Sequence, residues 1–237
     1  MSIVVVLPTY NEAENIVRLV PQLLALPCDL HIVVVDDASP DGTGQLAEQL
    51  AGEHPGRVEV IHRAGKLGLG TAYLTGFRRA FERNAQWILT MDADFSHPPR
   101  YIPEMIARSA AGDLVIGSRY VPGGGAVDSP FLRRVISRTA NLIARAGLGL
   151  KARDMTAGFR LYRREALESL PLDRIFSSGY SFLIELLYLI EQRGWRVVET
   201  PILFYDRQWG QSKISQGEIF KAMNTILRLG YRRLNGR

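Results

Sequence analysis

Two aspartates one residue apart, Asp92 and Asp94, follow an apolar run in the stretch TMDADFSHPP. Side chains two positions apart in extended backbone point to the same side, so one cation could lie between the two carboxylates. Mg²⁺ and Mn²⁺ prefer carboxylate, water and phosphate oxygens, and the lack of nearby His and Cys clustering argues against zinc. In the alternative interpretation, Asp94 and Ser96 are turn and cap residues before a helix that Pro98 and Pro99 open. An isolated pair more often belongs to a turn, so the metal interpretation depends on the neighbouring motifs.

A second acidic pair, Asp36 and Asp37, ends the apolar stretch LHIVVV. An unpaired carboxylate at the end of a buried strand is costly unless a ligand or backbone donors satisfy it. Asp37 is therefore a candidate for contacting a base or a ribose hydroxyl, whereas Asp41 in SPDGT is explained as a turn residue. The glycine-rich stretch KLGLGTAYLTGF matches neither a Walker loop nor the dinucleotide-binding G-x-G-x-x-G pattern. The two acidic pairs thus point to a nucleotide ligand bound in another way.

The elements that must position these carboxylates follow from the pattern of apolar residues. Five short β-branched runs alternate with amphipathic segments, which predicts strands over 2–8, 30–37, 57–62, 86–92 and 113–119. This alternation predicts an α/β fold with a mostly parallel sheet flanked by helices. Beyond a glycine- and proline-rich loop, helices are expected over 132–148, 180–193 and 215–234. Two further strands, near 159–163 and 195–204, are expected to extend the sheet.

Ligands of open α/β sheets bind beyond the carboxyl ends of the strands. Four of the predicted strands end in polar tails, with the sequences PTYNE, DDASPDGT, DADFSHPP and GSRY. We expect these tails to meet at one rim of the sheet, which would bring both acidic pairs to the same site.

Length and composition indicate one principal domain over 1–237. The 237 residues, 46% of them hydrophobic, suffice for a sizeable core, and no repeat or low-complexity linker divides the chain. Residues 1–118 hold 9 Lys and Arg against 14 Asp and Glu, whereas residues 119–237 hold 20 against 10. The basic half predicts an anionic partner such as a phosphate ligand or a lipid head group, and the lack of a reader motif argues against nucleic acid. We expect nucleotide binding in about 1–118 and acceptor and membrane contacts in about 119–237.

Several features predict a cytoplasmic protein. The single cysteine, Cys28, allows no intrachain disulfide, and the N-terminal stretch MSIVVVLPTYNE lacks the basic flank and cleavage site of a signal peptide. The longest apolar stretches, IVVVL and FLIELLYLI, are shorter than the roughly 18 residues that span a bilayer. We therefore expect neither secretion nor a transmembrane segment.

The helices expected over 132–148 and 215–234 alternate apolar residues with Arg and Lys. Such amphipathic helices can lie at an interface on anionic lipid. They predict peripheral contact with the cytoplasmic face of a membrane. In the alternative, both helices pack their apolar faces into the core and expose a solvated basic face.

Seven segments in this order, spread over nearly the whole chain, resemble one enzyme family. They are PTYNEAENI, VVVDDASPDGT, KLGLGTAY, MDADFSHPP, GSRYVPGG, DMTAGFRLYRREAL and FYDRQWGQSKIS. Together they resemble the family-two glycosyltransferases that make polyprenyl- or dolichyl-phosphate mannose. Seven matching segments are far more specific than the aspartate pair alone.

The resemblance implies a GT-A, Rossmann-like fold that transfers mannose with inversion from GDP-mannose to a polyprenyl or dolichyl monophosphate, with Mg²⁺ or Mn²⁺. The nucleotide-sugar site that it implies consists of Pro8, Tyr10, Glu12, Val35, Asp37, Ala93, Ser96, Arg119, Arg207 and Lys213. The metal site would be Asp92, Asp94 and Ser96. The acceptor phosphate would contact Arg119, Arg133 and Ser137. The catalytic set would be Asp92, Asp94, Arg119, Arg207 and Lys213.

The chemistry of this reaction suits such residues. A departing nucleoside diphosphate develops negative charge that a cation and fixed Arg or Lys groups offset. Arginine suits the acceptor phosphate because its planar fork binds phosphate oxygens bidentately. A phosphate monoester, with a second pKa of about 6, is largely dianionic at neutral pH and needs no strong general base. We therefore expect no His or Glu base, and a structural role for His97.

Other functions remain open. UDP-glucose or UDP-aminosugar enzymes that act on polyprenyl phosphate share most of these motifs, although DADFSHPP and the span-free C-terminal region favour mannose. A non-catalytic nucleotide-sugar-binding protein is a second alternative, against which the intact acidic and basic site residues weigh. An NAD-dependent oxidoreductase would need the glycine fingerprint that is missing. A separate membrane-anchor protein is a further partner to consider.

Overall fold

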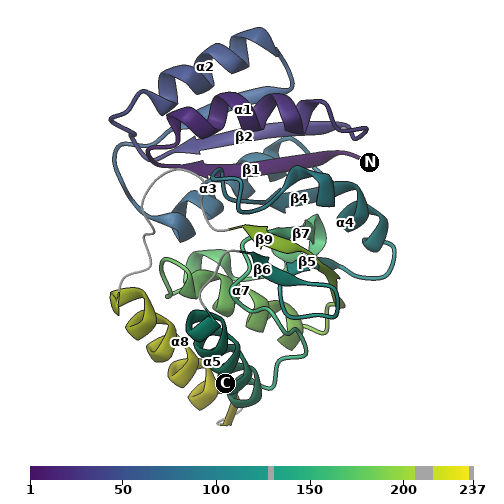
Figure 1. Ribbon diagram of the computed structural model, residues 1–237, viewed down its shortest axis with the longest axis vertical. Coiled ribbons are helices and arrows are strands. Elements are labelled where there is room, and N and C mark those ends of the chain that lie inside the picture. Colours follow the sequence, from purple (N-terminus) through teal and green to yellow (C-terminus); the bar gives the residue numbers. More distant parts are fainter. Residues whose placement is uncertain (128–130, 206–215, 235–237) are drawn as a thin grey trace.

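The computed structural model describes residues 1–127, 131–205 and 216–234 and has helices on both faces of a central sheet (Figure 1). The first half alternates strands and helices as expected: β1 (Ile3–Thr9), α1 (Ala13–Leu24), β2 (Leu30–Asp36), α2 (Thr43–Glu53), β3 (Val58–His62), α3 (Leu69–Glu82) and β4 (Trp87–Thr90). A 3₁₀ turn η1 (Pro99–Tyr101), α4 (Ile102–Arg108) and β5 (Leu114–Ser118) follow. All five strands predicted in this half are confirmed.

The second half carries longer helices and shorter strands. Its elements are β6 (Gly125–Val127), α5 (Phe131–Leu148), β7 (Arg160–Arg163), α6 (Arg164–Glu168), η2 (Leu172–Arg174), α7 (Ser181–Gln192), β8 (Val197–Pro201), β9 (Leu203–Tyr205) and α8 (Gln216–Leu234). The three long helices predicted for this half are present. None of the helices in the described ranges is long and apolar enough to cross a membrane.

The seven-stranded sheet has the order β3-β2-β1-β4-β7-β5-β8. Its pairs are parallel except at β7, which lies antiparallel to both β4 and β5. Both late segments add a strand to the sheet as expected, with β7 inserted near the middle and β8 at the edge. The segment expected as one strand over 195–204 also splits, because β9 leaves the main sheet and pairs with β6. Two separate sheets thus share that segment.

Alternate residues of each central strand pack on opposite faces of the sheet. On β1, Ile3, Val5 and Leu7 pack with apolar side chains of α1, α2 and α4, whereas Val4 and Val6 pack with those of α3 and α7. Burial on both faces accounts for the nearly unbroken apolar runs in the sequence. Two apolar clusters, one on each face, therefore support the sheet beneath the polar strand ends.

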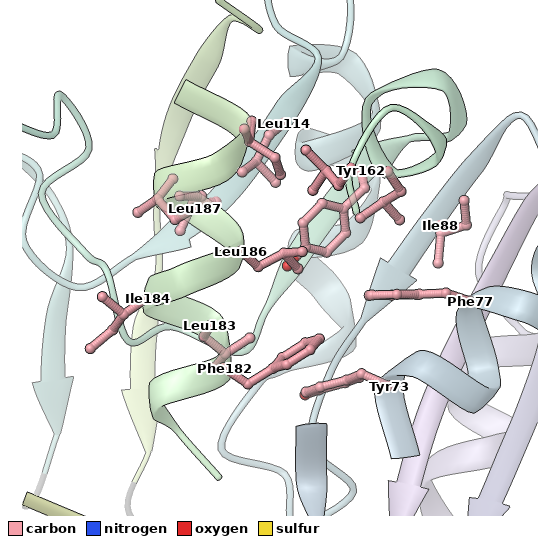
Figure 2. Close-up of a cluster of buried hydrophobic side chains, with 14 of the residues drawn as sticks. Tyr73, Phe77, Ile88, Leu114, Tyr162, Phe182, Leu183, Ile184, Leu186 and Leu187 are labelled. Carbon is pink, nitrogen blue, oxygen red and sulfur yellow. The ribbon is translucent and has the colours of Figure 1, made fainter. Parts of the chain in front are cut away.

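An aromatic cluster joins the two halves of the chain on the face of the sheet that α3 and α7 cover (Figure 2). The rings of Tyr73 and Phe182 stack with centroids 6.1 Å apart, and Phe77 meets Tyr162 edge-on at 5.7 Å. A Cβ atom added to Gly76 would lie 2.1 Å from Cγ1 of Val6, so only glycine allows α3 to approach β1 this closely. This packing fixes α3 and α7 against the sheet, and with them the loops that lead to the strand ends.

Candidate nucleotide-sugar site

A cleft of about 520 Å³ opens at the carboxyl ends of β1, β2 and β4. The described residues that line it are Pro8, Thr9, Tyr10, Glu12, Asp37, Lys66, Leu67, Gly68, Leu69, Ala72, Asp92, Ala93, Asp94, Ser178, Gly179, Tyr180 and Lys221. The expected meeting of polar tails is thus found for three of the four strands. The tail of β5, which contains Arg119, is not part of this lining.

Hydrogen bonds tie the loop after β1 to the loop after β2. The backbone N–H of Asn11 donates to Oγ of Ser39 at 3.0 Å, and that of Glu12 donates to Oγ1 of Thr43 at 2.9 Å. Asp36 accepts from the hydroxyls of Thr9 and Ser39 at 2.9 and 2.6 Å. Asp36 is therefore a structural acid that holds the cleft wall together.

Three turns of the cleft wall contain a non-glycine residue with left-handed backbone. The φ angles are 58° at Asn11, 53° at Ala38 and 60° at Phe95, in the loops after β1, β2 and β4. Such conformations cost about 1–3 kcal/mol each and persist where surrounding contacts enforce them. The cross-braced loops provide those contacts at the first two positions.

Donors from the protein satisfy the carboxylate of Asp37. It pairs with Arg63 and accepts the backbone N–H groups of Leu67 and Gly68 at 3.1 and 3.0 Å. The side chain lines the cleft and also shapes the loop before α3. Val35, expected in the nucleotide pocket, is fully buried in the core and is not part of the lining. Its side chain packs with Val4, Val6 and other apolar residues on the face of the sheet that α3 and α7 cover.

Asp92 and Asp94 lie together at the end of β4 and both line the cleft. Asp94 is 3% exposed, and its Oδ1 accepts the backbone N–H of Ser96 at 3.1 Å. The turn expected in the alternative interpretation is thus present, and it holds the carboxylate at the cleft rather than removing it. Ser96 is buried, and its hydroxyl has no hydrogen-bond partner among the described residues. Ser96 is not part of the cleft lining, although the neighbouring Ala93 is.

The donor set of the aspartate pair fits a hard divalent cation. Two carboxylates supply oxygen ligands, and the described part of the chain contains no group of three or more His, Cys, Asp and Glu that could hold a metal. An ion bound to Asp92 and Asp94 would therefore take its remaining ligands from substrate oxygens and water, as Mg²⁺ or Mn²⁺ commonly does. The same set does not suit zinc.

His97 occupies a structural position next to the acidic pair. Its ring is 2% exposed and packs against Phe159 and Phe204, with centroids 5.2 and 5.7 Å away. Nδ1 lies 3.0 Å from the backbone nitrogen of Asp92 and accepts its N–H. The nitrogen that could remove a proton is therefore already occupied, in agreement with the expected structural role.

Arg119 follows β5 and forms a bidentate pair with Asp154. Its Nε and one terminal nitrogen lie 2.8 and 2.7 Å from the two carboxylate oxygens, and Thr156 accepts a further hydrogen bond at 2.8 Å. Burial would raise the pKa of the Asp154 carboxyl, but the positive charge of Arg119 outweighs burial and holds that pKa below its usual value. Burial would lower the pKa of Arg119, and the charge of Asp154 raises it instead. The pair is therefore ionised throughout the physiological range.

Two glutamates hold the segment that carries Asp154. Glu199 accepts the backbone N–H groups of Arg153 and Asp154 at 2.9 and 3.0 Å. Glu191 accepts those of Lys151 and Ala152 at 2.8 and 3.1 Å. Sequence reasoning included Asp154 in the DMTAGF segment without assigning it a role, and nothing local in the sequence identified these glutamates.

The sequence also did not predict several other residues that line the cleft. Lys66 places Nζ 3.9 Å from the ring centroid of Tyr10, and Lys221 reaches the cleft from α8. Ser178, Gly179 and Tyr180 come from the loop before α7. Lys66 stands in the KLGLG segment, which is the only local signal for these positions.

Some expected site residues lie outside what the structure describes. Arg133 and Ser137 belong to α5, but their side chains are not among the described ones. Arg207 and Lys213 lie in 206–215, outside the described residues. Their roles stay predictions.

The two amphipathic helices lie side by side at the end of the molecule away from α1 and α2 (Figure 1). Ala144, Leu148 and Leu229 pack into the core, so each helix buries one apolar face. Each also exposes apolar side chains, namely Leu142 and Ile143 on α5 and Phe220, Met223, Leu227 and Tyr231 on α8. We call these six exposed residues the apolar stripe. The exposed face is thus not only a solvated basic face.

The family model described as glycosyl transferase family 2 matches residues 4–170. The polyprenol monophosphomannose synthase of Mycolicibacterium smegmatis is 46% identical over 96% of this chain and 86% of its own length. The undecaprenyl-phosphate mannosyltransferase of Micrococcus luteus is 43% identical over 97% of this chain and 94% of its own.

Among solved structures, glucosyl-3-phosphoglycerate synthase from Mycobacterium tuberculosis, in complex with Mn²⁺, UDP and phosphoglyceric acid, superposes with a TM-score of 0.68. The match covers 97% of this chain and 78% of that chain at 22% identity. At this identity the likeness concerns the fold alone. It confirms the expected GT-A-like architecture.

Proposed function

Because the chain belongs to glycosyl transferase family 2, as the seven segments predicted, we propose that it transfers mannose to a polyprenyl monophosphate and forms polyprenyl-phosphate mannose. The observation that carries the proposal is the near full-length similarity to two relatives whose names state this chemistry. The donor is GDP-mannose, as the resemblance implies. The acceptor is a polyprenyl phosphate, a class that includes dolichyl phosphate.

In this reaction an oxygen of the lipid phosphate forms a bond to C1 of mannose while the bond from C1 to the β-phosphate oxygen of GDP breaks. The electron pair of the broken bond leaves with GDP. Attack on the face opposite the leaving group inverts the configuration at C1. The dianionic phosphate carries no proton on the attacking oxygen, so the reaction needs no general base. His97, whose Nδ1 accepts the Asp92 N–H, therefore need not act as one.

Asp92 and Asp94 would hold Mg²⁺ or Mn²⁺ against the donor diphosphate. A divalent cation supplies charge stabilisation for the leaving group. The Asp94–Ser96 turn keeps one carboxylate oriented, and buried Ala93 keeps the backbone of the pair in the cleft wall. The glucosyl-3-phosphoglycerate synthase complex, which has the same architecture, contains Mn²⁺ and UDP, and this supports a cation in this fold.

The nucleoside would lie between the loops after β1 and β2. Pro8, Tyr10, Glu12 and Asp37 line that part of the cleft. The Leu67 and Gly68 amides that bind Asp37 fix the opposite wall. This wall is braced before any ligand arrives, so little ordering is needed on binding.

The acceptor phosphate would meet Arg119, with Arg133 and Ser137 of α5. Asp154 fixes one edge of the Arg119 guanidinium, and the negative charge of Asp92 helps to raise the pKa of Arg119, which supports a role for this arginine beside the acidic pair. A guanidinium held in this way would offer a fixed positive charge to the acceptor phosphate.

The lipid tail would approach along α5 and α8. The apolar stripe lies beside exposed basic residues such as Arg138 and Arg228, which suits an anionic membrane surface. We therefore place the protein peripherally on the cytoplasmic face of a membrane. A separate anchor protein would be an additional partner of the same face.

The experiment that tests this function offers three donors in parallel. Purified protein, Mg²⁺ or Mn²⁺ and a short polyprenyl phosphate are incubated with radiolabelled GDP-mannose, UDP-glucose or UDP-N-acetylglucosamine, and label in the organic phase is counted. We expect lipid label from GDP-mannose alone, lost with EDTA. Label from a UDP-sugar would overturn the donor assignment, and nucleotide-sugar binding without any turnover would favour the non-catalytic alternative. Matched polyprenyl and dolichyl phosphates distinguish the two acceptors.

A further inference from the structure

Lys221 joins the C-terminal amphipathic helix to the nucleotide cleft. It stands one turn into α8, close to the apolar stripe, and yet it lines the same cleft as Asp92 and Asp94. Its sequence context is that of a membrane-facing basic residue. The structure places it instead at the site of the chemistry.

The position of Lys221 is fixed by contacts further along α8. The guanidinium carbons of Arg228 and Arg232 lie 3.9 and 5.0 Å from the ring centroid of Phe176. Cation–π contacts of this kind favour one packing of the helix against the loop before α7. Leu229 is fully buried in the core on the same helix. The helix therefore cannot move away from the loop without losing these contacts.

The loop that α8 grips continues directly into the cleft wall. Buried Glu185 accepts the backbone N–H groups of Phe176 and Ser177 at 3.2 and 2.9 Å, and the Ser177 hydroxyl at 2.5 Å. The next residues, Ser178 to Tyr180, line the cleft. Lys221 and this wall thus form one assembly held by α7 and α8.

The charge of the cleft calls for cations at this place. Its described lining contains four carboxylates, those of Glu12, Asp37, Asp92 and Asp94, and its only basic members in that set are Lys66 and Lys221. Arg63 already neutralises Asp37. Among the described lining residues, these two lysines are therefore the ones that can offer positive charge to a phosphate-bearing ligand, beside any bound metal ion.

We propose that Lys221 is a phosphate-binding residue of the cleft, presented by α8, in a lining that also contains Lys66. The ligand group is a phosphate, either of the nucleotide donor or of the lipid acceptor. The inference rests on the proposed function for the identity of these substrates. A lysine suits the role because its flexible stem can deliver a point charge from the rim of an open cleft.

The test replaces Lys221 by methionine, which keeps the stem and removes the charge, and by arginine, which keeps the charge. The matched control is Arg233→Met on the same helix, where Arg233 contacts the carbonyl of Gly147 and not the cleft. Affinity for GDP with Mn²⁺ is measured by calorimetry without lipid, and the KM for a short polyprenyl phosphate is measured at saturating donor. Thermal unfolding of each variant confirms that it folds.

We expect Lys221→Met to weaken GDP binding about tenfold, the scale of one charge-assisted hydrogen bond, with Lys221→Arg retaining most of the affinity and Arg233→Met unchanged. Unchanged GDP affinity with an acceptor KM raised about tenfold would also support the proposal and assign the phosphate to the acceptor. No change in either quantity, or equal losses in Lys221→Met and Arg233→Met, would overturn it. Wild-type protein that binds UDP and not GDP would contradict the proposed donor, and the same three variants would then test Lys221 with UDP.

Discussion

The nucleotide end of the molecule and the end formed by α5 and α8 differ in how far their side chains are satisfied by contacts within the protein. At the nucleotide end, the loops after β1 and β2 satisfy one another's polar groups, and protein donors occupy Asp36 and Asp37. At the other end, α5 and α8 carry six of the ten large apolar side chains that are exposed among the described residues. The loops of one end are held by hydrogen bonds within the protein, and the helices of the other end leave apolar area exposed to water.

The difference indicates how the two substrates would be received. A braced cleft loses little conformational entropy when a small polar ligand binds. An exposed apolar stripe with basic neighbours gains free energy only when another apolar phase covers it. The contrast thus predicts that changes at one end alter nucleotide chemistry and changes at the other alter membrane contact.

The largest effect is expected from Asp94→Asn. Loss of one metal-binding carboxylate should lower kcat/KM about 1,000-fold, or about 4 kcal/mol, because the cation would no longer be held against the diphosphate. The free energy of unfolding should change little, since the amide oxygen can still accept the Ser96 N–H. Steady-state turnover with GDP-mannose over a range of Mn²⁺ concentrations measures the effect.

Asp113→Asn is the matched control for that prediction. Asp113 accepts the backbone N–H of Arg196 at 3.0 Å and pairs with Arg163 at 3.0 Å, away from the cleft. The control should lose stability and keep its metal dependence. If Asp94→Asn retained full turnover, the metal assignment would be wrong.

The next largest effect is expected from Asp154→Asn. The change leaves the largely buried Arg119 without its partner charge, which should lower the free energy of unfolding by about 3 kcal/mol at pH 7. The exposed pair of Arg78 and Asp173 provides a control, since Asp173→Asn should cost less than about 0.5 kcal/mol. Urea unfolding of the three proteins measures both values.

The pH dependence of that difference has a defined sign. The pKa of Asp154 is lowered in the folded protein from an ordinary value of 3.8, so the ion pair stabilises the fold above about pH 4. That stabilisation is lost as the pH falls through the lowered pKa. The gap between wild type and Asp154→Asn should therefore be constant from pH 7 to 5 and narrow below pH 4. A gap that widened on acidification would contradict the pair's assigned charge state.

A smaller effect is expected from Leu227→Glu on the apolar stripe. Leu227 is 66% exposed, so its replacement costs little stability, but a charge there should weaken binding to anionic vesicles about tenfold. Val17→Glu on α1, at the nucleotide end, is the matched control and should bind vesicles like wild type. Vesicle sedimentation at low and moderate salt measures both. Equal loss in the two variants, or no vesicle binding by wild type at either salt concentration, would remove the contrast between the ends.

Local patterns predicted the parts of the fold that depend on neighbours in sequence. The apolar runs located β1 to β5, and the amphipathic periods located α5, α7 and α8, because burial imposes those periods directly on the chain. The antiparallel insertion of β7 between β4 and β5 depends on which strands meet in space. No residue of the RLYR segment encodes that choice, so the sequence alone did not reveal it.

The site residues likewise divide into those that local sequence patterns predict and those that depend on contacts between distant segments. Asp37, Asp92 and Asp94 were predicted because they lie at the ends of the apolar runs of β2 and β4. Asp154 was not assigned a role because its partner, Arg119, lies 35 residues away along the chain. Lys221 was interpreted from its own helix, whose pattern indicates a surface and says nothing of the cleft that the helix reaches. Val35 stays a prediction, since a motif position does not show whether a side chain buried at the end of a strand reaches the ligand.

The smallest effect is expected from Ala38→Gly in the loop after β2, at the nucleotide end. Ala38 has a φ of 53° and an exposed side chain in the loop after β2. Glycine relieves the left-handed strain but loosens the unfolded chain, so Ala38→Gly should raise the free energy of unfolding by about 0.5 kcal/mol. Ala51→Gly, inside α2, has no strain to relieve and should lower it by about 1 kcal/mol.

The sign of the change in the free energy of unfolding, measured with GDP affinity, shows what the strain at Ala38 does for the cleft. If Ala38→Gly stabilises the protein and leaves GDP affinity unchanged, the strain at Ala38 is only a by-product of the hydrogen bonds that fix Ser39. If it stabilises the protein and weakens GDP binding, the left-handed turn is part of the preorganised wall, since a freer loop must be ordered again by the ligand. Destabilisation by both variants alike would show that Ala38 carries no strain, and the nucleotide end would then owe its rigidity to the cross-loop hydrogen bonds alone.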